Sequence, residues 1–343
     1  MSIGAYTLVW DELEGVTADG HRTPAWEDRM RILVVGAGAI GGYFGARLLE
    51  AGRDVTFLVR PRRAAQLARG LFVVSRFGNV DLATPPTATA DSLREPFDLI
   101  LLSCKAYDLD GAMDSFAPTV GPRTAILPLL NGMRHLDLLV ARFGAERVLG
   151  GQCLISAVLD ADGRVLHLNE THLFAFGEPD GSRSARVETI ATLLSDAKFD
   201  ARPSDAILQE MWEKWVFIAA GAGITCLMRA AVGDIVAAGA ADLAAALLDE
   251  CAAIAARQGF APRQASIERS RAMLTAADSP VTASMLRDIE KSAPIEADHI
   301  LGDLLARAGE PADERSLLRI AYAHVKAYEA RRAREAVSAA KAA

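Results

Sequence analysis

The sequence predicts an α/β domain with a doubly wound parallel sheet, followed by an all-α domain. A β-branched run at residues 31–35 leads directly into a glycine-rich turn and then into a segment whose apolar residues recur at helical spacing. Nearly continuous apolar runs at residues 97–103 and 124–130 are typical of parallel strands that are covered on both faces. Beyond Pro203 the chain becomes rich in alanine, and its apolar residues recur three and four positions apart.

Composition places the chain among folded, globular proteins. Its 343 residues are enough for two domains, and a content of 51% hydrophobic and 24% charged residues argues against a disordered or fibrous chain. The formal net charge is -7, and no long run of one sign occurs. We therefore do not expect nucleic acid or an acidic membrane surface as a partner.

These patterns divide the chain into four segments. Residues 1–29 lack helical or strand periodicity and form an N-terminal extension, for which a mobile tail or a start codon upstream of Met30 is favoured over a docking arm. Residues 30–203 form the α/β domain, and residues 204–335 form the helical domain. Residues 336–343 are a tail, because the Ala-, Arg- and Lys-rich end of the chain is expected to fray.

Neither a membrane segment nor a signal peptide is expected. The longest uncharged apolar stretch, residues 215–228, is shorter than the roughly 20 residues that a bilayer requires, and it predicts a buried helix. The start of the chain lacks the basic region and apolar core of a signal peptide. Four widely spaced cysteines form no metal-binding pattern and predict buried thiols in a reducing compartment: Cys104, Cys153, Cys226 and Cys251. We therefore expect a cytoplasmic protein without a metal site.

A glycine-rich turn marks the candidate cofactor site. Gly36, Gly38 and Gly41 fit the spacing G-x-G-x-x-G. In this pattern the first glycine permits the turn, the second lets the backbone approach a pyrophosphate, and the third lets the helix pack on the strand. The backbone amides of Ala39 and Ile40, at the helix start, then face the phosphates. A second strand completes the β-α-β unit, which favours a dinucleotide-binding, Rossmann-type domain over a bare structural turn.

The end of this second strand, residues 55–59, indicates which dinucleotide binds. NAD-binding domains of this type place an acidic residue there for the ribose 2′-hydroxyl, whereas this chain has Arg60. A guanidinium suits a 2′-phosphate, and the nearby acid, Asp54, precedes the strand at its opposite end. We therefore expect NADP (NADPH) as the cofactor. The alternative is that Arg60, Arg62 and Arg63 form only a solvated basic loop.

Two polar residues follow the next two predicted strands. Lys105 comes after the first apolar run and Asn131 after the second, so both lie at the carboxyl edge of the sheet, where open α/β sheets bind ligands. We expect both residues in the site, the alternative being loop or capping roles. Further on, the turn signal DADG at residues 160–163 suggests an antiparallel extension of the sheet. His167, a lone histidine in this region, is given no chemical role.

From Met30 to about Ala330 the chain resembles the ketopantoate reductase family, the NADPH-dependent 2-dehydropantoate 2-reductases. The matching segments are GAGAIGGYFG, LLSCKAYD, LLNGM, MWEKW and SMLRDIEKSAPIEADHILG, of which the last is the most specific. The resemblance implies a helical domain like that of 6-phosphogluconate dehydrogenase relatives, with the active site in the cleft between the domains. It leaves the oligomeric state open, a homodimer being one option.

The resemblance also implies roles for single residues. Lys105 and Asn131 would line the nicotinamide and substrate cleft, Lys214 would be the catalytic lysine, and Ser284 and Glu296 would contact a 2-oxo acid substrate. Reduction of such a substrate needs a hydride on carbon and a proton on the developing alkoxide, and a partly buried lysine with a lowered pKa can donate that proton. Glu296 would hold the lysine or the substrate hydroxyl in place. Ordinary helix roles for these three residues are the alternatives.

One departure from the family concerns the substrate. The family typically carries two asparagines downstream of the catalytic lysine, and here Ile218 and Ala222 occupy these substrate-binding positions. Sites that lose hydrogen-bonding groups discriminate poorly between hydroxylated and apolar analogues. Reduction of ketopantoate to pantoate, as in pantothenate and coenzyme A biosynthesis, therefore competes with reduction of another, more apolar 2-oxo acid. A non-catalytic NADP-binding sensor on the same fold is a third alternative.

Overall fold

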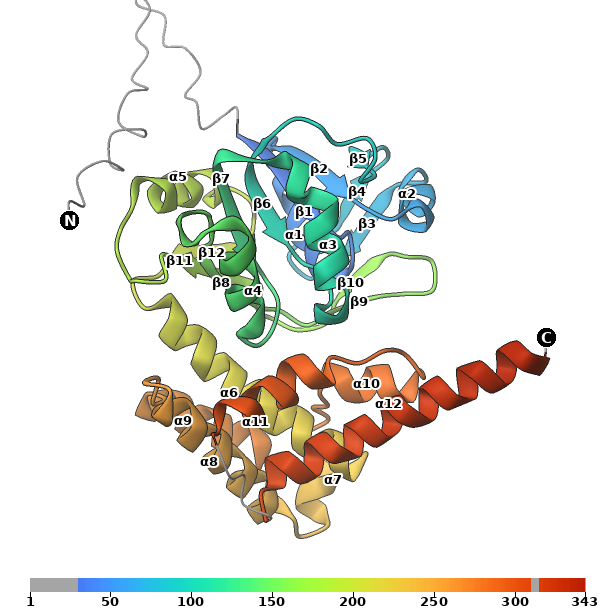
Figure 1. The fold of residues 1–343 in the computed structure, drawn as a ribbon, viewed down its shortest axis with the longest axis vertical. Helices are drawn as coiled ribbons and strands as arrows, with labels where there is room; N and C mark the ends of the chain where they lie inside the picture. The colour runs from blue at the N-terminus through green and yellow to red at the C-terminus, as the bar shows by residue number, and fades with distance from the viewer. Residues whose placement is uncertain (1–29, 310–314, 343) are drawn as a thin grey trace, which may run out of the picture. The chain divides into compact units, whose positions relative to one another are not determined.

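The computed structural model describes residues 30–309 and 315–342 of the chain (Figure 1). The expectation for the extension at residues 1–29 therefore concerns a segment outside the described residues. The chain divides into two compact units. The first contains the segments up to Leu130 and His135–Ile207, and the second contains Asn131–Arg134 and the segment from Leu208 onward.

A five-stranded parallel sheet forms the centre of the first unit, in the order β5–β2–β1–β6–β7. Its strands are β1 (Arg31–Val35), β2 (Asp54–Leu58), β5 (Thr87–Ala88), β6 (Phe97–Leu102) and β7 (Val120–Pro128). β1 lies between β2 and β6, and its residues from Ile32 to Val35 are buried. Burial on both faces explains why these strands appear as continuous apolar runs. The sheet confirms the predicted doubly wound α/β domain.

The helices of this unit follow the strands along the chain (Figure 1). They are α1 (Ala39–Glu50), α2 (Pro61–Leu67), α3 (Leu109–Phe116), α4 (Arg134–Phe143) and α5 (Ala185–Leu194), with short 3₁₀ turns η3 (Ala106–Asp108), η4 (Ala117–Thr119) and η5 (Ala145–Arg147). α1 packs against β2 of the main sheet. It also packs against three strands of a second sheet, β3 (Leu71–Val74), β9 (Ala157–Leu159) and β10 (Val165–His167). Because it is covered on two sides, all its residues from Gly41 to Leu48 are buried.

The turn at residues 160–163 forms a hairpin, but not in the expected sheet. β9 (Ala157–Leu159) and β10 (Val165–His167) pair in antiparallel fashion. β10 pairs with β3 (Leu71–Val74), which in turn pairs with β4 (Val80–Leu82), so that the hairpin belongs to a separate four-stranded sheet. The hairpin is held there because Val165 packs closely on α1, where a Cβ at Gly42 would stand 2.9 Å from the valine side chain.

The expected antiparallel extension is made by other strands. β8 (Gly150–Leu154) and β11 (Leu173–Gly177) pair in antiparallel fashion, and β11 pairs with β12 (Asp200–Pro203) in parallel. The amide of Leu149 donates a hydrogen bond of 2.9 Å to the carbonyl of Ile126 in β7. This bond connects the three-stranded sheet to the edge of the main sheet.

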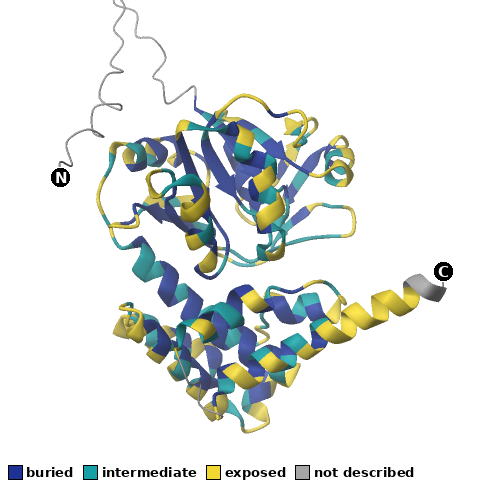
Figure 2. Cartoon of the chain, in the orientation of Figure 1, coloured by how far each residue is buried: buried dark blue, intermediate teal, exposed yellow. Residues whose placement is uncertain are grey.

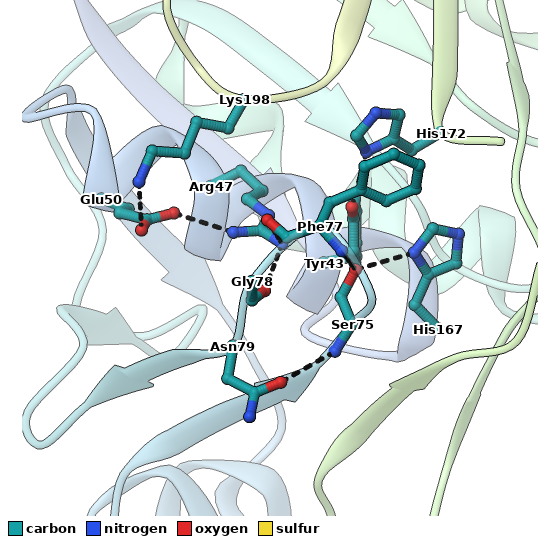
Figure 3. Close-up of polar contacts among 10 residues, drawn as sticks. All are labelled: Tyr43, Arg47, Glu50, Ser75, Phe77, Gly78, Asn79, His167, His172 and Lys198. Carbon is teal, nitrogen blue, oxygen red and sulfur yellow. Dashed lines mark hydrogen bonds and ion pairs between the residues drawn. The ribbon is translucent and has the colours of Figure 1, made fainter. Parts of the chain in front are cut away.

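A polar cluster surrounds the buried Arg47 side chain of α1 (Figure 3). The Arg47 side chain is fully buried, and its guanidinium donates to the Glu50 carboxylate at 2.9 Å and to the Gly78 carbonyl at 2.6 Å. In the same cluster the His167 ring makes a hydrogen bond of 3.0 Å with the Ser75 hydroxyl. Its other ring nitrogen lies 3.0 Å from the carbonyl oxygen of Thr171. Both ring nitrogens have partners, which agrees with giving this histidine no chemical role.

The second unit is all-α, as predicted, and most of its helices carry both buried and exposed residues (Figure 2). They are α6 (Ile207–Met228), α7 (Val232–Ala237), α8 (Ala241–Arg257), α9 (Gln264–Leu274), α10 (Ser284–Glu290), the π-helical turn η6 (Asp298–Gly302), α11 (Asp303–Arg307) and α12 (Leu317–Ala342). The apolar stretch at residues 215–228 is the greater part of α6. Across residues 30–309 and 315–342, no helix has both the length and the apolar character needed to cross a membrane.

Two details differ from the expectations. The sequence predicts fraying at the C-terminal end, whereas α12 continues to Ala342 even though residues 331–339 are exposed. This segment is rich in alanine, and Arg331 forms an ion pair with Glu335 one helical turn later. The alanine content and the ion pair each favour a helix even where its side chains do not pack against the rest of the protein. Cys104 is half-buried rather than buried, because it lies in the turn after β6; the other three cysteines are buried as predicted.

Candidate active site

The glycine turn between β1 and α1 is closed by two close approaches. Gly36 has a φ of +93°, a conformation that favours glycine. Gly41 lies so near the turn that a Cβ would stand 2.0 Å from the Gly36 carbonyl oxygen and 2.2 Å from Ser103 Oγ. The Ser103 hydroxyl lies 2.9 Å from the Gly36 carbonyl, to which it donates. The first and third glycines therefore have the structural roles that the spacing predicts.

Gly38 has a different environment. It precedes α1 as the N-cap residue, and no atom lies within 4 Å of the place where a Cβ would stand. The first hydrogen bond of the helix runs from the Gly42 amide to the Gly38 carbonyl, so the amides of Ala39, Ile40 and Gly41 have no acceptor within the helix. Open space beside such amides at a helix start suits a pyrophosphate. These residues fit a bound dinucleotide.

Arg60 lies at the end of β2, as the N-cap residue of α2. Its guanidinium forms an ion pair of 2.5 Å with Asp108, and this hydrogen bond raises the pKa of Arg60. The arginine side chain is 74% exposed, so it remains accessible to a ligand. In the register of β1 and β2, Asp54 lies opposite Arg31, where both strands start. This acid is therefore at the other end of the strand from Arg60.

Arg63 holds the glycine turn, a role that the sequence did not indicate. Its Nε donates to the Ala37 carbonyl at 2.8 Å, and its Nη1 donates to the Gly163 carbonyl at 3.1 Å. The side chain thereby joins the glycine turn to the β9–β10 hairpin. Burial lowers the pKa of Arg63. The position of Arg63 one helical turn after Arg60 was the only sequence signal for this role. The sequence could not show which carbonyls Arg63 contacts, because Ala37 and Gly163 lie far from it along the chain.

The strands that precede Lys105 and Asn131 end at the same edge as β1. Val35 pairs with Leu102, and Leu102 pairs with Pro128, so the carboxyl ends of β1, β6 and β7 are aligned. Lys105 is half-buried and is the N-cap residue that precedes η3 in the first unit. Asn131 belongs to the helical unit, where its backbone makes a hydrogen bond with His299.

Three of the proposed site residues lie on one face of α6. Lys214, Ile218 and Ala222 follow one another at intervals of four residues, which places them on successive turns of the same face. Lys214 and Ile218 are half-buried, and Ala222 is buried. Beside Lys214, the buried Glu213 carboxylate accepts two hydrogen bonds of 2.7 Å from the Arg263 guanidinium, which fixes α6 to the start of α9.

Glu296 and Ser284 also belong to the helical unit. Glu296 is half-buried just before the π turn η6, and its backbone carbonyl accepts a hydrogen bond of 2.9 Å from the Ile300 amide. Ser284 is exposed and is the first residue of α10. The preceding amide, of Ala283, donates to Thr225 Oγ1 of α6 at 3.4 Å. The described residues contain no group of three or more His, Cys, Asp or Glu side chains that could hold a metal ion.

Comparison with known proteins finds two models of one protein family, one in each unit of the chain. The family model for ketopantoate reductase PanE/ApbA matches residues 32–181, and the model for the C-terminal domain of the same family matches residues 206–329. The uncharacterized oxidoreductase YkpB of Bacillus subtilis is 38% identical over 88% of this chain and 99% of its own length. The 2-dehydropantoate 2-reductase of Archaeoglobus fulgidus is 31% identical over 82% of this chain and 91% of its own.

A solved structure shows the same fold over both units. The 2-dehydropantoate 2-reductase of Geobacter metallireducens superposes with a TM-score of 0.78 and 28% identity, covering 87% of this chain and 99% of that chain. The sequence resemblance is thereby confirmed at the level of the family. The chain belongs to the ketopantoate reductase family and is an oxidoreductase that acts on a CH–OH or keto group.

Proposed function

We propose that this protein reduces a 2-oxo acid to the 2-hydroxy acid with NADPH, and that its two units have separate roles in this reaction. The observation that carries the proposal is the distribution of the candidate residues between the units. The glycine turn, Arg60 and Lys105 belong to the first unit. The residues proposed to contact substrate all belong to the helical unit: Asn131, Lys214, Ile218, Ala222, Ser284 and Glu296. One unit would bind the cofactor, and the other would bind the substrate and supply the proton.

The proposed chemistry needs a hydride on the carbonyl carbon and a proton on its oxygen. The bound nicotinamide would supply the hydride. Lys214 would hydrogen-bond to the carbonyl oxygen, stabilise the negative charge that develops there and donate the proton from its ammonium group. Glu296 would orient Lys214 or the new hydroxyl, while Asn131 and the Ser284 hydroxyl would bind the substrate. The product is a 2-hydroxy acid.

The surroundings of Arg60 support NADPH rather than NADH. The accessible guanidinium can pair with a 2′-phosphate, and a charge-assisted contact of this kind is stronger than a neutral hydrogen bond. The nearby carboxylate of Asp108 accepts one hydrogen bond from this arginine. Because a guanidinium has five donors, it can bind both the carboxylate and a phosphate.

Ketopantoate is the substrate that family membership suggests, and α6 favours a second candidate. Ile218 and Ala222 place apolar side chains on the turns that follow Lys214, where the family typically has asparagines. Ketopantoate carries a hydroxyl group that would lose hydrogen-bonding partners there. A 2-oxo acid with an apolar side chain would bury that side chain against these residues. We therefore expect ketopantoate turnover to be poor relative to a less polar 2-oxo acid.

The test is NADPH oxidation, followed by absorbance, with ketopantoate and a panel of aliphatic and aromatic 2-oxo acids. The wild-type protein should show its highest kcat/KM with an apolar member of the panel. The variant Ile218→Asn/Ala222→Asn should shift the preference toward ketopantoate. A clear wild-type maximum for ketopantoate would refute the apolar preference and retain the reductase. Tight NADPH binding without turnover of any 2-oxo acid would refute the reductase and favour a sensor.

A further inference from the structure

The segment that follows Glu296 is a π-helical turn inside the helical unit. In η6 (Asp298–Gly302) the amide of Asp303 donates to the carbonyl of Asp298, five residues earlier, instead of four. A π turn is wider than an α turn by one residue, is rarely found, and is frequent at functional sites. Two side chains of the same unit, one outside the turn and one within it, tie the turn to neighbouring segments.

Trp215 is the first of these side chains. It is fully buried, and its indole N–H donates a hydrogen bond of 2.9 Å to the carbonyl of Ile300 in the middle of the π turn. Trp215 follows Lys214 directly on α6, and Ile300 lies four residues after Glu296. This bond therefore joins the backbone segment of Glu296 to the helix of Lys214.

His299, within the π turn, is the second. It is buried, makes a hydrogen bond with the backbone of Asn131 and packs against the next residue, Gly132. A Cβ on Gly132 would stand 3.0 Å from the histidine ring, and the φ of this glycine is +79°. Burial lowers the pKa of His299, which favours the neutral ring, and its contacts with Asn131 and Gly132 make it a hydrogen-bonding spacer. The π turn is thus also tied to the loop that carries Asn131.

We infer that Trp215 and His299 are positioning residues, which use the π turn to set the placement of Lys214, Glu296 and Asn131 relative to one another. The inference rests on the proposed function, because it concerns the orientation of the proposed proton donor. Trp215 would act on kcat, through the alignment of Lys214 and Glu296. His299 would act mainly on KM, through the Asn131 loop. Misplacement by about 1 Å can cost about 100-fold in rate, so loss of one such bond is measurable.

The neighbouring Trp212 is a matched control on the same helix. Trp212 and Trp215 are both buried, and the Arg307 guanidinium carbon lies 5.8 Å and 5.7 Å from their respective ring centres. Trp212 stacks on Phe260, with 5.4 Å between ring centroids. The indole hydrogen bond to the π turn is made by Trp215. A change that removes only the indole N–H therefore separates positioning from packing.

The experiment replaces each tryptophan in turn with benzothienylalanine, which keeps the shape of the indole and lacks its N–H. At position 215 this should lower kcat about tenfold or more and shift the apparent pKa in the kcat–pH profile, with NADPH affinity within about twofold of wild type. At position 212 kcat and its pH profile should stay within about twofold of wild type. His299→Phe should raise KM for the 2-oxo acid more than it lowers kcat.

The outcomes separate this inference from the proposed function. If turnover depends on Lys214 but the two tryptophan replacements behave alike, the positioning inference is wrong and the reductase stands. The same conclusion follows if the replacement at position 215 lowers the melting temperature while kcat and the pH profile of the folded protein stay unchanged. If the wild-type protein shows no turnover that depends on Lys214, the proposed function fails and the inference fails with it.

Discussion

Replacing Gly38 with alanine tests whether the glycine turn serves a ligand rather than the fold. The new methyl group would meet no protein atom within 4 Å, and the backbone at this position has a φ of -76°, which alanine adopts readily. Reduced freedom of the unfolded chain stabilises such a variant by about 0.4–1 kcal/mol, and the poorer N-cap costs a similar amount. The free energy of unfolding should therefore change by less than about 1 kcal/mol.

Cofactor binding should respond differently, because the methyl group would occupy the space beside the first amides of α1. We expect the Kd for NADPH to rise about tenfold or more, which corresponds to about 1.4 kcal/mol. The assays are thermal unfolding of the cofactor-free protein and a fluorescence titration with NADPH. Gly41→Ala should impair both properties, since its Cβ would stand 2.0 Å from a backbone oxygen and destabilise the fold by about 2 kcal/mol.

Gly111→Ala is the matched control for this prediction. A Cβ at Gly111 would also meet nothing within 4 Å, but this glycine lies within α3, where alanine should stabilise the helix by up to about 1 kcal/mol. Its NADPH affinity should match that of the wild type. If Gly38→Ala binds NADPH as tightly as the control does, the open space is not the cofactor site and the reasoning fails.

Two further predictions concern charged side chains. Arg60→Ala should weaken NADPH binding about tenfold and leave NADH binding nearly unchanged in the same titration; equal effects on both cofactors would contradict the assignment of Arg60 to the 2′-phosphate. Arg263→Ala should lower the free energy of unfolding in urea by about 2 kcal/mol, because the buried Glu213 carboxylate loses its ion pair, whereas Arg271→Ala, at an exposed pair with Asp249, should cost less than about 1 kcal/mol. Burial raises the pKa of Glu213 but the hydrogen bonds from Arg263 outweigh it, so the net pKa is lowered. The stabilisation is therefore complete above the unfolded pKa of about 4.3 and is lost as the pH falls through the folded pKa; a cost that does not shrink in acid would contradict this.

Local patterns made part of the fold predictable. The strand, glycine turn, helix and second strand are adjacent in sequence, and their spacing fixes their order. The strands β3 and β4 escaped prediction because they have only four and three residues, and because β3 also pairs with β10 from far along the chain. The hairpin was assigned to the wrong sheet for the same reason.

The candidate site shows a similar division. Lys214, Ile218 and Ala222 were selected through the family resemblance, and their spacing of four residues puts them on one face of α6. The π turn was not predictable, because it is held by a bond between Trp215 and Ile300, which are 85 residues apart. The same holds for the hydrogen bond from Arg63 to the glycine turn, which the sequence presented only as part of a basic loop.

The identity of the proton donor is the central claim, and kcat of Lys214→Ala tests it most directly. We predict that kcat with the best 2-oxo acid falls about 10² to 10⁴-fold while the Kd for NADPH stays nearly unchanged. Glu296→Ala should have a smaller effect, and the double variant should lose less than the product of the two single losses, because both residues act on one oxygen. Near-normal kcat in Lys214→Ala, together with loss of activity in Lys105→Ala, would contradict the account and assign the proton to the edge of the sheet.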